Sequence, residues 1–228
     1  MFFVTNRTLL TGFLCLLLLV ANSYPSILRA ETPRTIGWQD LQPSRPPPAD
    51  PLSELDPVVA YELELVASSR ILQKNGEIGP GNPLYEEAIE YERGLLSRGV
   101  DVNGFISRYR QFHADLKQLG NELNISLNRT NIRIAGYLLP LEFADLGVTE
   151  FLLVPYVGAC IHVPPPPPNQ LVQVSLSEPM ISTELYFPVW VSGILHAQHD
   201  QTLLALVDGE AQVPTGYKIP NATVVPYE

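Results

Sequence analysis

The pattern of hydrophobic and polar positions changes once along the chain, near residue 123. Between residues 53 and 122 hydrophobic residues recur at largely three-to-four-residue spacings, which is the period of an amphipathic helix. After residue 123 the hydrophobic stretches are short, rich in β-branched and aromatic residues, and separated by turn residues, which is typical of strands. The sequence therefore predicts an α+β protein with a helical region at 53–122 and a β domain at 123–228.

Capping residues divide the helical region into three segments. Asp56 and Asn82 each precede a proline, so each offers a side-chain oxygen to the backbone of a first helical turn. Asp101 is the third predicted cap. The predicted ends of the three helices are Gly76, Gly99 and Gly120. We expect these helices to form a hairpin region that packs on the β domain.

Six short stretches are predicted to be strands. They are residues 124–141, 148–157, 170–177, 186–197, 202–207 and 221–228. Gly136 and Gly193 lie inside two of them, where glycine favours the sharp bends at which a small barrel closes. We therefore expect a small all-β barrel or sandwich over residues 123–228.

The N-terminal part of the chain is predicted to be an export signal followed by a linker. Arg7 precedes an uncharged apolar run at residues 9–21, which is short for a membrane span and typical of a secretory signal. Residues 1–23 are thus predicted to be a signal peptide or, if it is retained, an N-terminal membrane anchor. Residues 24–52 are proline-rich and favour an extended linker, in which Trp38 and Leu41 are able to dock on the body.

Acidic charge limits the possible partners. The chain has a net charge of −10, and residues 123–228 hold nine acidic and three basic residues, which gives −6 for this part. Phosphate backbones and anionic lipid surfaces are bound by clustered Lys and Arg, so this charge argues against nucleic acid as a partner. Cations would be attracted.

Cys160 is the main candidate for chemistry. Cys15 lies in the predicted signal, so Cys160 is the only cysteine that remains after cleavage, and no intramolecular disulfide can form. The thiol can be buried and structural, can bind a metal, or can react. As a nucleophile it would use His162 as its base, with Asn169 the nearest candidate to orient that base. The sequence contains no P-loop, dinucleotide fingerprint, zinc-protease helix or serine elbow, so these patterns favour a binding protein over an enzyme.

Metal binding is the more specific hypothesis for Cys160 and His162. In an extended chain Cys160 and His162 point the same way with Cα atoms about 6.5 Å apart, so a thiolate and an imidazole can share zinc or a similar soft ion. A closed zinc site needs four ligands, and His196 and His199 are the natural completion. Their odd spacing requires a turn after His196, because a flat strand would aim the two rings at opposite faces.

Five consecutive prolines follow the Cys-x-His motif. They predict a polyproline II rod about 15 Å long, which cannot be a central strand. As a rigid strap the rod would cross the rim of the barrel, fixed by backbone hydrogen bonds of the two amides that follow it. As a docking surface it would contact an aromatic-lined partner. The candidate partner-binding residues are Pro164, Pro165, Pro166, Pro167, Pro168, Asn169 and Gln170.

Three stretches of this sequence are similar to an exported bacterial family called domain of unknown function 3299. They are "RIAGYLLPLEF", "EFLLVPYVGACIHVPPPPPNQLVQV" and "PVWVSGIL", and the Cys-x-His followed by prolines and Asn-Gln is the most specific part. The resemblance implies a barrel of the oligonucleotide/oligosaccharide-binding (OB) type. It also implies a periplasmic accessory role beside an ABC-type transport system, in some cases one linked to zinc supply, and it brings no established reaction.

Two functions from different classes follow. The first is a periplasmic accessory protein that binds zinc or a similar ion through Cys160 and His162, with His196 and His199 as helpers. The second is a protein-interaction adaptor that offers the prolines and its acidic surface to an ABC transporter or another envelope protein. In that alternative Cys160 is structural.

Overall fold

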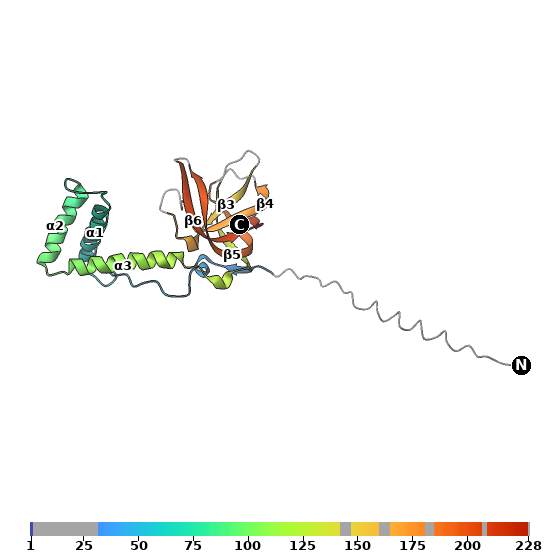
Figure 1. Ribbon diagram of the computed structural model, residues 1–228, viewed down its shortest axis with the longest axis horizontal. Helices are drawn as coiled ribbons and strands as arrows, with labels where there is room; N and C mark the ends of the chain where they lie inside the picture. Colours follow the sequence, from blue (N-terminus) through green and yellow to red (C-terminus); the bar gives the residue numbers. More distant parts are fainter. Residues whose placement is uncertain (2–31, 142–146, 160–164, 181–184, 207–208, 228) are drawn as a thin grey trace. The chain divides into compact units, whose positions relative to one another are not determined.

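The described residues form three α-helices and seven strands (Figure 1). The computed structural model describes residues 1, 32–141, 147–159, 165–180, 185–206 and 209–227. The predicted signal peptide thus lies outside the described residues, apart from Met1. The helices are α1 (Pro57–Lys74), α2 (Pro83–Ser97) and α3 (Val102–Asn121). The strands are β1 (Arg34–Ile36), β2 (Thr130–Pro140), β3 (Val148–Val154), β4 (Val172–Met180), β5 (Phe187–Leu206), β6 (Gly209–Ile219) and β7 (Thr223–Pro226). The α+β class is therefore confirmed.

All three predicted helix caps are present. The side chains of Asp56, Asn82 and Asp101 accept hydrogen bonds from backbone N–H groups of the first turns of α1, α2 and α3. Each bond satisfies a donor that has no partner within the helix. Gly76 and Gly99 follow the ends of α1 and α2 with φ values of 78° and 77°, a conformation that favours glycine.

The end of α3 differs from the prediction. The helix continues through Gly120 to Asn121, so Gly120 is not a terminating residue. A Cβ atom at this position would lie 2.5 Å from Cβ of Pro167. Gly120 is therefore required because the polyproline segment approaches the last turn of α3 closely.

The helices have a hydrophobic core of their own. Helices α1, α2 and α3 contact one another, and Leu63, Leu95 and Phe105 are almost completely buried between them. Stripes of hydrophobic residues at helical spacing explain this packing. In the part of the chain that the structure describes, no helix is long and apolar enough to cross a membrane.

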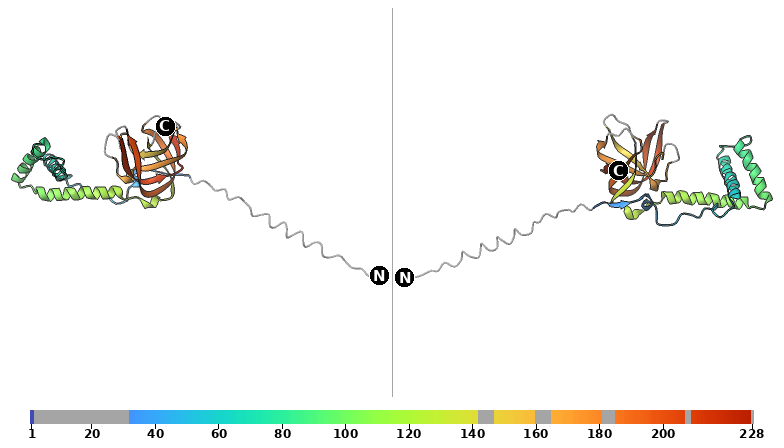
Figure 2. Two further views of the ribbon diagram at one scale, coloured as in Figure 1. Left: turned by 45° about the horizontal axis from the view of Figure 1, so that its top comes forward. Right: turned by 180° about the vertical axis from the view of Figure 1, so that it is seen from behind.

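Five of the strands close into a ring. The sheet order is β1-β2-β3-β4-β6-β5-β7, and an additional pairing of β2 with β5 joins the ends of the central five strands (Figure 2). Within the ring all pairings are antiparallel except β4 with β6, which is parallel. A Cβ atom at Gly193 would lie 2.6 Å from Ile219, so glycine allows β5 to pass close to the end of β6.

Two strands differ from the sequence-based prediction. The predicted strands at 186–197 and 202–207 are parts of one long strand, β5, whose pairing with β6 shifts register between Ala197 and Asp200. Strand β6 was not predicted. Its sequence, "GEAQVPTGYKI", is interrupted by Gly and Pro and lacks a continuous β-branched run, yet it fills the ring between β4 and β5.

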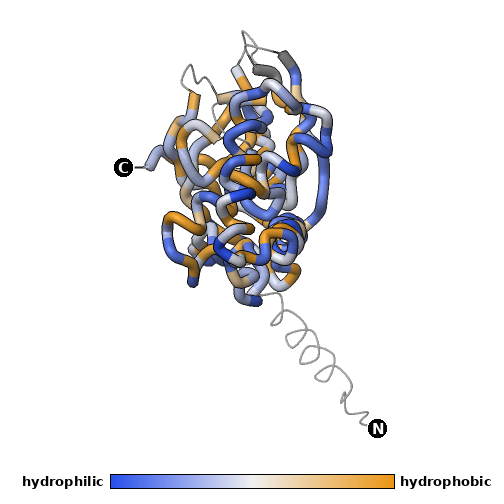
Figure 3. The backbone as a smooth tube through the Cα atoms, turned by 90° about the vertical axis from the view of Figure 1, so that its left-hand side faces the viewer, coloured by the Kyte–Doolittle hydropathy of each residue, from blue (hydrophilic) through white to orange (hydrophobic). Residues whose placement is uncertain are grey.

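The interior of the ring is hydrophobic. Hydrophobic and hydrophilic residues are interspersed along the backbone (Figure 3), and β3 is buried on both faces, because Phe151 and Leu153 belong to one hydrophobic cluster and Leu152 and Val154 to another. Phe151, Val191 and Tyr217 are among the completely buried side chains of the main cluster. A second cluster includes Leu152, Leu171 and Ala159. It reaches the loop that carries the Cys-x-His motif, because Ala159 directly precedes Cys160.

Part of the predicted linker belongs to this fold. Strand β1 pairs in parallel with β2, and the short 3-10 helix η1 (Trp38–Leu41) follows it. Nε1 of Trp38 donates a hydrogen bond to the carbonyl of Ala135 at 2.8 Å, and Leu41 is completely buried. Both residues thus dock on the ring.

Candidate functional site

The polyproline segment lies between β3 and β4 in the sequence, and we call residues 164–168 the proline strap. Pro165 and Pro167 are exposed, whereas Pro166 is buried. Pro167 has φ −62° and ψ 156°, a polyproline II conformation, and the 3-10 helix η3 (Pro168–Gln170) begins at the next residue. Pro167 is therefore extended, Pro168 starts a 3-10 turn, and residues 165–168 are not a strand of the sheet.

Asn169 fixes the strap to the end of α3. Its side-chain amide donates hydrogen bonds to the carbonyls of Leu119 and Glu122, at 2.8 and 3.0 Å. The carbonyl of Leu119 also accepts from the backbone N–H of Glu122 at 3.2 Å, so the Asn169 amide supplies a second donor to a carbonyl in the last turn of the helix. Asn169 is only 2% exposed, and burial in a low-dielectric site strengthens both bonds.

Gln170 fixes the same segment to the N-terminal part of the fold. Its side-chain amide donates to the carbonyls of Trp38 and Asn169, at 3.0 and 2.9 Å. On the surface, the guanidinium of Arg45 forms two 2.8 Å hydrogen bonds with the carboxylate of Glu122. These bonds lower the pKa of the Glu122 carboxyl from its ordinary value. The end of the strap is thus bonded to α3 and to η1.

Tyr217, on β6, joins two further segments to the ring. Its hydroxyl donates to the carbonyl of Leu41 and accepts from the backbone N–H of Asn124, both at 2.6 Å. The side chain is completely buried, and this burial raises its pKa to about 12. No local pattern around Tyr217 signals this role, because β6 itself is not predicted from the sequence.

The Cys-x-His motif starts next to an anchored residue. Cys160, His162 and Pro164 lie outside the described residues, but Ala159 is completely buried in the second hydrophobic cluster. The hydroxyl of Tyr186 donates a hydrogen bond to the carbonyl of Ala159 at 2.6 Å. Tyr186 has φ 60°, a conformation that costs a non-glycine residue about 1–3 kcal/mol and that often occurs at functional sites. The motif therefore lies between two fixed points, Ala159 and the strap.

His199 and the end of the strap line one shallow pocket. Its volume is about 420 Å³, and the lining residues are Asn121, Pro168, His199, Asp200, Gln201 and Pro214. We call it the strap pocket. The register shift in β5 lies between Ala197 and Asp200, next to His199. Two residues that the sequence singled out for different reasons, Pro168 and His199, are thus neighbours.

His196 is placed differently. It is half-buried, pairs with Lys218 of β6 in the sheet register and does not line the strap pocket. The chain does not turn after His196, because β5 continues to Leu206. Within the described ranges, no three His, Cys, Asp or Glu side chains come close enough to hold a metal ion. The four-ligand set that includes Cys160 and His162 therefore stays a prediction.

The fold and this site define an α+β protein with a closed ring of strands, in which the two residues after a proline strap are hydrogen-bonded to the end of the last helix and to η1. A family model described as a protein of unknown function (DUF3299) matches residues 38–226, so the chain belongs to this family, as its resemblance predicts. A crystal structure of a DUF3299 family protein from Pseudomonas aeruginosa PAO1 is 29% identical and has a TM-score of 0.47. That similarity covers 86% of this chain and 97% of the other. No curated protein matches the sequence.

Proposed function

We propose that this protein is an exported accessory binding protein of the periplasm that works beside an ABC-type transport system. We further propose that Cys160 and His162 bind zinc or a similar soft ion. Thiolate and imidazole are the donors that such ions prefer. His199 is the third candidate ligand, since it lies beside the strap, and His196 is the fourth. The export signal, the transport role and the link to zinc rest on the sequence and on the resemblance to the family.

One observation carries the metal proposal. The Cys-x-His segment is short, and both of its flanks are fixed: Ala159 by burial and by Tyr186, and the strap by Asn169 and Gln170. A ligand site works best when its supporting residues are held before the ligand arrives. Because both flanks of the segment are fixed, the thiol of Cys160 and the imidazole of His162 would be held close together before a metal ion arrives.

The strand order supports a finer reading of the fold. We infer that the ring β2-β3-β4-β6-β5 is a small barrel of the OB type, with α1 and α2 forming a helical hairpin before it. The motif then lies in the loop that connects the second and third strands of the barrel, β3 and β4. OB barrels bind their ligands on the face of these two strands. The acidic charge of the domain favours a cation there over a nucleic acid.

Metal analysis tests this proposal. The full-length protein, purified without an affinity tag, is expected to retain about one zinc or copper ion per chain, as a single site would. Cys160→Ala is expected to lose it, whereas His113→Ala, which removes an exposed histidine of α3, is expected to keep it. If the wild type and Cys160→Ala hold equally little zinc and copper, the metal proposal is wrong.

A second candidate function has its own support. Pro165 and Pro167 are exposed on a segment whose next residues are bonded to the fold. Rigid exposed prolines can dock in an aromatic-lined groove at low entropic cost. The protein would then be an adaptor for a transporter or another envelope protein, and Cys160 would be structural.

The adaptor proposal predicts a binding defect without a metal defect. In a pull-down with the periplasmic part of the neighbouring transport system, Pro165→Ala is expected to weaken capture. Pro46→Ala, which changes an exposed proline far from the strap in the sequence, is expected to have no effect. Equal capture of wild type and Pro165→Ala would contradict the adaptor function.

A further inference from the structure

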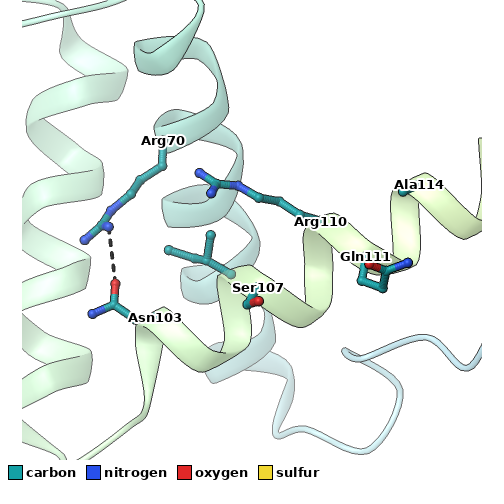
Figure 4. A pocket seen from close by; sticks show the side chains of 7 residues that line it. Arg70, Asn103, Ser107, Arg110, Gln111 and Ala114 are labelled. Atoms are coloured by element: carbon teal, nitrogen blue, oxygen red, sulfur yellow. Dashed lines mark hydrogen bonds between the residues drawn. The ribbon is translucent and has the colours of Figure 1, made fainter.

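A cationic pocket lies between α1 and α3, on elements that the proposed metal site does not use. Its volume is about 460 Å³, and its lining includes Arg70, Asn103, Ile106, Ser107, Arg110 and Gln111 (Figure 4). We propose that this pocket binds a carboxylate group. Arg70 and Arg110 supply the recognition, and we call the site the arginine pocket.

Arg70 is held in place before any ligand binds. Its guanidinium extends from α1 toward α3, where Nη1 donates to Oδ1 of Asn103 at 3.3 Å, and Nη2 forms an ion pair with Glu92 of α2. The side chain of Arg70 is 37% exposed and that of Glu92 is 16% exposed, so the pair is partly shielded from water. Arg70 is therefore oriented by two partners, and Glu92 balances its charge.

Arg110 is the group that remains available. Its side chain extends from α3 toward α1, above Ser107 (Figure 4). No described residue forms an ion pair with Arg110 or accepts a hydrogen bond from it. Ser107 lies one helical turn before Arg110 and offers a hydroxyl on the same side of α3. The amide nitrogen of Gln111 is already used, because it donates to Asp115 at 2.8 Å.

The charges select the kind of anion. Two guanidinium groups and the Glu92 carboxylate sum to one positive charge, which a single carboxylate balances. A phosphate dianion would leave an excess negative charge in a protein that already carries −10. A guanidinium can also bind the two oxygens of a carboxylate through parallel hydrogen bonds, which adds geometric selectivity. The occupant is thus the carboxylate of a free organic acid or of a peptide C-terminus.

Titration with small acids tests the arginine pocket. The probes are propionate, N-acetylalanine, and neutral propionamide, added to the full-length protein at matched ionic strength. The readout is the NMR signal of each arginine Nε–H group. Both carboxylates are expected to shift the Arg110 and Arg70 signals along saturable curves, whereas propionamide is expected to shift neither. Tighter binding of N-acetylalanine than of propionate identifies a peptide C-terminus as the source, and the reverse order identifies a free acid.

Matched variants separate the pocket from general charge effects. Arg110→Gln is expected to weaken binding by about tenfold or more, as loss of a bidentate charged pair predicts. Arg110→Lys keeps the charge but not the fork of donors, and it is expected to weaken binding as well. Arg93→Gln removes the same charge from an exposed site on α2 and is expected to bind normally. Uniform, unsaturable shifts of all arginines, or normal binding by Arg110→Gln, would overturn the proposal.

Discussion

Tyr217 offers a sharp test of how the fold holds its separate segments together. Tyr217→Phe keeps the buried ring, so no cavity forms, but it removes two 2.6 Å hydrogen bonds, to Leu41 and from Asn124. A buried hydrogen bond contributes about 1 kcal/mol net, and a partner left without one costs about 1–3 kcal/mol. We therefore expect the free energy of unfolding at pH 7 to fall by about 2–4 kcal/mol, measured by urea denaturation.

The same residue predicts a pH dependence. Burial raises the pKa of Tyr217 from 10.0 to about 12 in the folded protein. Below pH 10 both states keep the proton, and between pH 10 and 12 the unfolded state loses it first. The stabilisation by Tyr217 is thus complete below pH 10 and is lost as the pH rises toward 12, by about 1.4 kcal/mol per unit.

The comparison of variants isolates this effect from other titrating groups. The stability difference between wild type and Tyr217→Phe is expected to narrow as the pH rises from 10 to 12. Tyr227→Phe is the matched control, because Tyr227 is 52% exposed, and it is expected to change stability by less than about 0.5 kcal/mol. A Tyr217→Phe protein as stable as the wild type at pH 7 would refute the role of the hydroxyl.

Four more variants probe the strap and the helices by urea denaturation. Asn169→Ala removes two hydrogen bonds to the end of α3 and is expected to cost about 2 kcal/mol; an unchanged midpoint would show that water replaces the amide. Gly120→Ala places a methyl group 2.5 Å from Cβ of Pro167 and is expected to cost about 1–3 kcal/mol, whereas Gly94→Ala, with open space around it, is expected to stabilise α2 by up to about 1 kcal/mol. Equal effects of the two glycine variants would contradict close packing of the strap. Asp101→Ala removes the cap of α3 and is expected to cost about 0.5–2 kcal/mol, so a neutral result would count against the cap.

The helices could be predicted well because their signals are local. Asp56, Asn82 and Asp101 act within one turn of their own position, so a pattern in the sequence is enough to place them. Gly120 shows where this reasoning ends. Glycine is needed at position 120 because Pro167, which is distant in sequence, packs against it. No local pattern distinguishes such a glycine from one that ends a helix.

Strand β6 could not be predicted because its stability comes from its neighbours. Its residues pair with β4 on one side and β5 on the other, so a sequence with a weak intrinsic preference for strands still completes the ring. The continuity of β5 has the same origin. The polar stretch around His199 interrupts the hydrophobic pattern, while the pairing with β6 continues beyond it after a register shift.

At the candidate site, the sequence indicated that two amide side chains anchor the strap, but it did not indicate which carbonyls they bond to. The amides of Asn169 and Gln170 do bond to backbone carbonyls, as a rigid strap requires. That these carbonyls belong to α3 and to η1 depends on contacts distant in sequence. The same holds for three other contacts, which also join residues distant in sequence. They are the hydrogen bonds of the Tyr186 and Tyr217 hydroxyls and the ion pair of Arg70 with Glu92.

Zinc K-edge X-ray absorption tests the central claim most directly, namely that the segment between Ala159 and the strap is a soft-metal site. Measured on the full-length protein after zinc loading and removal of unbound ion, the spectrum is expected to show one sulfur ligand at about 2.3 Å and nitrogen ligands at about 2.0–2.1 Å. Cys160→Ala is expected to lose the sulfur shell. Zinc that does not remain bound, or a wild-type spectrum without sulfur, would contradict the account.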